Sequence, residues 1–74
     1  MDVEDVADRL DAIAEEIGDL AIDRLREATG MARRGETPDP GVVAEERRLT
    51  RARRSVQKAV VLLRSPAGHN DDDA

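Results

Sequence analysis

The chain has 74 residues, with 12 Lys and Arg against 17 Asp and Glu, and a formal net charge of −5. It contains no Phe, Tyr, Trp or Cys, so its core must be aliphatic and disulfide bonds are excluded. A structural zinc site is not expected, because His69 is the single histidine. A chain of this size draws only about 3–5 kcal/mol from its own core, so self-association is the remaining source of stability.

Neither a membrane span nor a signal peptide is expected. The longest apolar run, residues 59–63, is far shorter than the about 18–20 residues that cross a bilayer. The first five residues lack a basic segment followed by an apolar one. These features predict a soluble, cytoplasmic protein.

The first predicted element is a helix over about residues 2–34. Asp2 is a suitable N-cap, and Gly35 is a suitable left-handed residue behind Arg33 and Arg34. An earlier end at Gly30 is the alternative. The apolar residues follow spacings of three and four, which predict a coiled-coil-like seam; they are Val3, Val6, Leu10, Ile13, Ile17 and Leu20. The pattern then slips by one residue to Ala21, Leu25 and Ala28.

The second predicted element is a helix over about residues 40–65. Residues 35–40 are rich in turn formers, Asp39 and Pro40 suit the first positions of a helix, and Pro66 disfavours its continuation. Its predicted seam comprises Val42, Leu49, Ala52, Val56, Ala59 and Leu63. The sequence therefore predicts an all-α fold, an antiparallel helical hairpin over residues 1–65, followed by a disordered acidic tail at residues 66–74.

Charge differs between the two predicted helices. Residues 2–27 hold ten acidic side chains against three arginines, and residues 42–65 hold seven basic side chains against two glutamates. Opposite charges favour pairing of the two arms and disfavour the pairing of each arm with its own copy.

The run at residues 59–63 is apolar around the whole helix circumference, and a single partner helix cannot cover every side of it. We therefore expect homodimerisation into a four-helix bundle. The predicted dimer interface comprises Val56, Ala59, Val60, Leu62 and Leu63.

Enzyme signatures are missing from the sequence: it has no Cys nucleophile, no phosphate-binding Gly-rich loop and no Gly-x-Ser-x-Gly elbow. We expect a non-enzymatic protein without metal or cofactor. Binding to nucleic acid is disfavoured by the net negative charge and by the lack of aromatic side chains for base stacking.

The second predicted helix carries a line of polar residues spaced four, three and four apart: Glu46, Thr50, Arg53 and Gln57. We call this line the polar stripe. A carboxylate accepts from the N1–H and N2–H edge of guanine, and an arginine bonds O6 and N7, stacks on the base or pairs with phosphate. The alternative is an ordinary solvated face, since an Arg-rich amphipathic helix commonly carries such residues.

Residues 46–61 resemble the motif Glu-x3-Ser-x2-Arg-x3-Gln-x3-Asp of RsiG-type anti-sigma factors of actinobacteria. Glu46, Arg53 and Gln57 match, Thr50 replaces Ser, and Val61 stands where the motif has Asp. The resemblance implies binding of cyclic di-GMP by paired motifs on antiparallel helices, and a sigma factor as protein partner. One motif per chain then requires a homodimer.

The leading hypothesis is a small helical homodimer that binds cyclic di-GMP and acts through protein–protein interaction. The predicted ligand contacts are Glu46, Thr50, Arg53 and Gln57, with Arg47, Arg54 and Lys58 as additional phosphate-facing cations. The alternative is a helical dimer that binds no nucleotide and serves as a protein-interaction adaptor.

Overall fold

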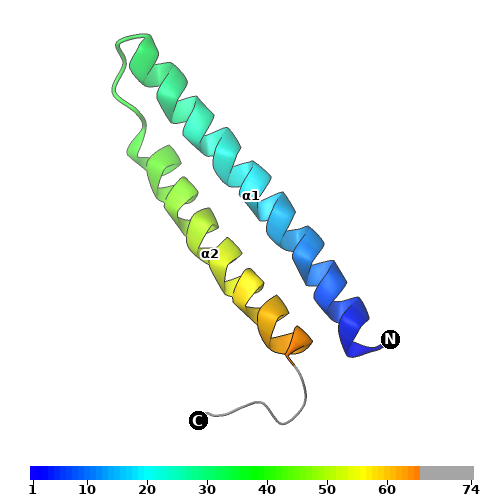
Figure 1. Cartoon of the computed structure of the whole chain (residues 1–74). Helices are drawn as coiled ribbons and strands as arrows, with labels where there is room; N and C mark the ends of the chain where they lie inside the picture. Colours follow the sequence, from blue (N-terminus) through cyan, green and yellow to red (C-terminus); the bar gives the residue numbers. More distant parts are fainter. Residues whose placement is uncertain (66–74) are drawn as a thin grey trace, which may run out of the picture.

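The computed structural model describes residues 1–65, which form two antiparallel helices (Figure 1). Helix α1 spans Val3–Arg33 and helix α2 spans Pro40–Arg64. The two helices pack along their length, and no strand occurs in the described residues. The predicted all-α hairpin is confirmed. The predicted tail at residues 66–74 lies outside the described residues.

Local side-chain chemistry explains where α1 begins and ends. Asp2 is the N-cap: its carboxylate accepts from the backbone N–H of Asp5, whose carboxylate accepts from the backbone N–H of Asp2. At the other end Gly35 has a φ of 78°, and Glu36 N–H donates to Met31 O at 2.9 Å. This is a Schellman ending, which needs a left-handed residue at Gly35. The helix therefore continues past Gly30, as predicted.

The ends of α2 also follow from local residues. The Asp39 carboxylate accepts from Gly41 N–H at 2.8 Å, and Pro40 occupies the first helical turn. Ser65 is extended, with ψ at 142°, because Pro66 follows it. Both caps agree with the sequence prediction.

The contact between the helices is built from small residues of α1. The buried positions of this helix are Ala7, Ala14, Gly18 and Ala21. Residues seven apart share one face, so the three alanines form a line directed at α2. The single buried residue of α2 within the described chain is Val60. A core of three alanines and one valine buries little apolar surface for a chain of this size.

The seam predicted for α1 is correct only in part: Leu10 and Ile17 are half-buried and Ala21 is buried. That prediction directs Val3, Ile13 and Leu20 at α2, but they are 55 %, 44 % and 50 % exposed. The alanine line lies next to them and takes the contact instead. Small side chains allow a close approach of the two helix backbones, and the larger side chains are then left at the edge of the contact.

The seam predicted for α2 is closer to the structure. Val42, Leu49, Val56 and Leu63 are half-buried, whereas Ala52 is exposed. Of the residues predicted to form a dimer interface, Val60 is buried inside the hairpin, and Val56, Ala59 and Leu63 are half-buried. Leu62 remains 65 % exposed, as does its neighbour Val61 at 64 %.

Neither α1 nor α2 is long and apolar enough to cross a membrane.

Candidate binding surfaces

The polar stripe on α2 lies at the edge of the contact with α1. Glu46 and Thr50 are half-buried, while Arg53 and Gln57 are exposed. The Thr50 hydroxyl donates to the Glu46 carboxylate at 2.8 Å. The four side chains thus share one side of α2, and the carboxylate already accepts one hydrogen bond within the stripe.

Arg53 lies against the backbone of α1 at Gly18. A Cβ atom added to Gly18 would stand 3.2 Å from Arg53 Nε and 3.4 Å from Arg53 Cζ. A methyl group at this position would be in tight contact with the guanidinium group, which would have to shift slightly. The planar group is therefore seated on α1, and it still meets solvent because Arg53 is exposed.

Acidic side chains of α1 surround the far end of the same side. Arg64 Nη2 lies 2.7 Å from Asp8 Oδ1, Nε lies 3.1 Å from Glu4 Oε2, and Nη1 lies 3.6 Å from Asp11 Oδ2. The hydrogen bond to Asp8 raises the pKa of the Arg64 guanidinium above its ordinary value, so this side chain stays charged at every usual pH. The cluster joins the C-terminal end of α2 to the N-terminal end of α1.

The three additional cations of the sequence prediction lie on a line of their own beside the polar stripe, since they are spaced seven and four residues apart. Arg47, Arg54 and Lys58 are all exposed. Successive helical residues are about 100° apart, so Arg54 lies about 100° from Arg53 and Lys58 about 140° from it. Arg47 lies about 120° from Arg53, so all three cations are turned further from α1 than the stripe is, and Arg54 is the nearest of them to it. The structure brings Glu46, Thr50, Arg53 and Gln57 together on one side of α2, and the three additional cations lie outside this group.

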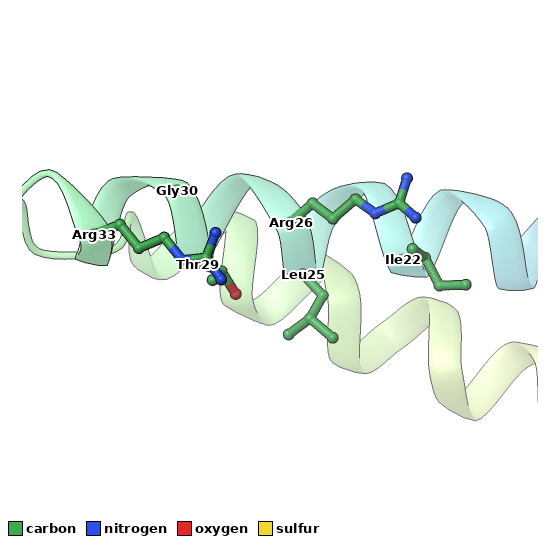
Figure 2. A pocket seen from close by; sticks show the side chains of 6 residues that line it. All are labelled: Ile22, Leu25, Arg26, Thr29, Gly30 and Arg33. Carbon is green, nitrogen blue, oxygen red and sulfur yellow. The ribbon is translucent and has the colours of Figure 1, made fainter.

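One open hollow of about 510 Å³ lies on α1 near the loop (Figure 2). All six lining residues belong to α1, with Ile22, Leu25 and Thr29 among them. It is a shallow space between side chains of one helix, and none of the stripe residues lines it. This hollow is open to solvent and does not enclose a small molecule.

The sequence predicted a second surface only in part, because only Ala59 and Leu62 of its residues belong to the predicted dimer interface. Val6, Ile13 and Leu20 are seven residues apart on α1, Ala52 and Ala59 lie on the adjoining side of α2, and Leu62 lies at the outer edge of that side; we call these six residues the apolar face. Ile13, Leu20, Ala52 and Leu62 are exposed on it. The signal was present in the sequence, since two seven-residue lines, one of alanines and one of large residues, run side by side along α1.

Comparisons with known proteins do not assign a function to these surfaces. No family model matches the chain, and searches of curated proteins and of solved structures found no match.

Proposed function

We propose that this chain is a non-enzymatic interaction protein that works as a self-associated helical hairpin. The observation that carries the proposal is the mismatch between its core and its surface. The buried apolar side chains are Ala7, Ala14, Ala21 and Val60, whereas Leu20 and Leu62 are at least half exposed. Large aliphatic side chains outside and alanines inside favour a partner that covers the outer ones.

Thermal unfolding at several protein concentrations tests this proposal. If folding and association are coupled, Tm rises with concentration, because mass action favours the associated folded state. Circular dichroism at 222 nm over a hundredfold concentration range would show this rise. A Tm that does not change with concentration would contradict self-association.

Leu62→Lys is the variant that best separates association from hairpin folding. Its side chain is 65 % exposed, so a lysine there costs the hairpin little, but it would bury an unpaired charge in an interface. Leu63 is less suitable, since it is half-buried against α1. We expect Leu62→Lys to remove the concentration dependence of Tm.

The second candidate function is binding of cyclic di-GMP at the polar stripe. It is favoured by one observation: the exposed guanidinium group of Arg53 lies against Gly18 of α1, on the same side of α2 as Thr50 and Gln57. Such a group suits stacking on a base or bidentate bonding to it. The resemblance to RsiG-type motifs adds the ligand and a sigma factor as the protein partner. Two features count against this candidate. Val61 lacks the hydrogen-bond acceptor of the motif's Asp, and the carboxylates of α1 repel the phosphate groups of the ligand.

Isothermal titration with cyclic di-GMP tests the second candidate, with GTP and other cyclic dinucleotides as ligand controls. Arg53→Ala should weaken binding by about 1.5–3 kcal/mol per site, the value of a hydrogen bond to a charged group. Arg51→Ala is the matched control, because it removes the same charge from an exposed position two residues away. Arg53→Lys keeps the charge but loses the planar fork, and it should also weaken binding. Equal affinities of the Arg53→Ala and Arg51→Ala variants, or no heat with the wild type, would reject this candidate.

A further inference from the structure

The hairpin has two broad sides, and the polar stripe and the apolar face lie on opposite ones. On α1, Gly18 is in contact with Arg53 of the stripe, and Leu20 lies about 160° away from Gly18 around the helix. On α2, Ala52 lies about 160° from Thr50 by the same spacing. The alanine line of α1 runs between the two sides. A copy that covers one side therefore leaves the other exposed.

The apolar face is complementary to itself in size. Arg64 lies beside Asp8, and Arg53 lies beside Gly18, which sets the levels of the two antiparallel helices. By this count Ile13 is level with Ala59, and Leu20 is level with Ala52. Large side chains thus project from α1 beside small ones on α2. A second hairpin can be related to the first by a 180° rotation about an axis that runs parallel to the helices over the apolar face. Its Ile13 and Leu20 would then pack on Ala59 and Ala52 of the first copy.

Charge selects this arrangement over the other two-fold arrangement of the same faces. Rotation about the long axis lays the acidic α1 of each copy over the basic α2 of the other. Rotation about a crosswise axis would lay the acidic α1 of one copy over the acidic α1 of the other, so that like charges would face each other. In the first arrangement Asp23 at the rim of one copy also comes level with Arg48 of the other.

We propose that two copies of this chain pack through their apolar faces with a two-fold axis parallel to the helices. The result is a four-helix bundle in which both loops lie at the same end and every neighbouring helix pair is antiparallel. This inference rests on the proposed self-association and specifies its surface and geometry. It places the interface along the length of α1, whereas the sequence predicted an interface at the C-terminal end of α2.

The arrangement also has a consequence for any ligand. Each copy keeps its polar stripe on the side away from the interface, so the two stripes of a dimer face outward in opposite directions. A ligand held at Arg53 would then bind to each copy separately. One ligand assembly shared between the two stripes of the dimer would require the other sides of the hairpins to meet.

Pulsed dipolar electron paramagnetic resonance on a Thr37→Cys variant tests the geometry. Thr37 is exposed in the loop, and the chain has no natural Cys, so a single spin label reports the loop position. In the proposed bundle the loops of two copies lie within about 20 Å, two interaxial distances of 8–10 Å. In the crosswise arrangement they lie about 45 Å apart, the length of a 31-residue helix.

A short distance in a dimer would support the proposed geometry. A long distance in a dimer would overturn the geometry and leave self-association in place. A monomer, which gives no dipolar modulation between labels, would overturn self-association as well. The double variant Asp23→Arg with Arg48→Asp adds a second readout: each single change should weaken the dimer several-fold, and their combination should restore it.

Discussion

At the residue scale, Gly18 is the position where the backbone of α1 meets the Arg53 side chain of α2. Gly18 lies in the middle of α1, where a glycine costs about 1 kcal/mol relative to alanine. A Cβ atom at this position would lie 3.2 Å from Arg53 Nε, so the glycine makes room for the Arg53 side chain. The exposed guanidinium group is at the end of a flexible side chain, so it can move when a methyl group is added.

Gly18→Ala is therefore predicted to stabilise the hairpin, but by less than the full difference in helix propensity. Gly30→Ala is the control, since a Cβ there meets only the side chain of Arg34, the C-cap residue of α1, at 3.4 Å. Thermal unfolding of both variants should show a larger rise in Tm for Gly30→Ala. A fall in Tm for Gly18→Ala would mean that Arg53 is held rigidly in place, and a rise equal to that of Gly30→Ala would mean that the contact is absent.

Gly35 has the opposite requirement. Its φ of 78° lies in the left-handed region, which a side chain disfavours. Gly35→Ala should therefore destabilise the chain by about 1 kcal/mol, the usual cost of a left-handed residue with a Cβ. Chemical denaturation would measure this loss, and an unchanged midpoint would contradict the Schellman ending.

The helices themselves show which features local sequence could predict. The capping residues Asp2, Asp39 and Gly35 act on neighbours within a few positions, so the ends of both helices followed from the sequence. The facing side of α1 followed only in part, because Ile13 and Ala14 belong to adjacent seven-residue lines and both lines are apolar. The choice between them depends on how closely the backbones approach, which is a property of the packed pair.

The candidate site divides in the same way. The spacing of Glu46, Thr50, Arg53 and Gln57 is by itself enough to predict that they share one side of a helix. The seat of Arg53 on Gly18 depends instead on the alignment of two separate helices, which no local pattern encodes.

Ion pairs at the open end of the hairpin should contribute to its stability in a salt-dependent way. Arg64 contacts Glu4, Asp8 and Asp11, whereas Arg51 is exposed and has no ion pair within residues 1–65. Arg64→Ala should lower Tm more than Arg51→Ala at low ionic strength. Since salt screens exposed charges, the difference should shrink in about 1 M NaCl. A difference that is unaffected by salt would assign the effect of Arg64 to packing.

At the scale of the whole molecule, the chain separates its charges and its apolar surfaces. Helix α1 is acidic and α2 is basic, so the two helices of one hairpin attract each other. For the same reason, α1 of one copy attracts α2 of a second copy. Leu20 and Leu25 provide a matched pair for testing where that copy binds. Both are leucines of α1 with similar exposure, 50 % and 55 %, but Leu20 lies on the apolar face and Leu25 lines the hollow on α1.

Sedimentation equilibrium of the wild type, Leu20→Lys and Leu25→Lys at equal micromolar concentration is the most direct test of self-association through the apolar face. We predict a dimer for the wild type and for Leu25→Lys, and a monomer for Leu20→Lys, because only Leu20 would carry an unpaired charge into the interface. A monomeric wild type, or a dimer that is lost in Leu25→Lys and kept in Leu20→Lys, would contradict the account.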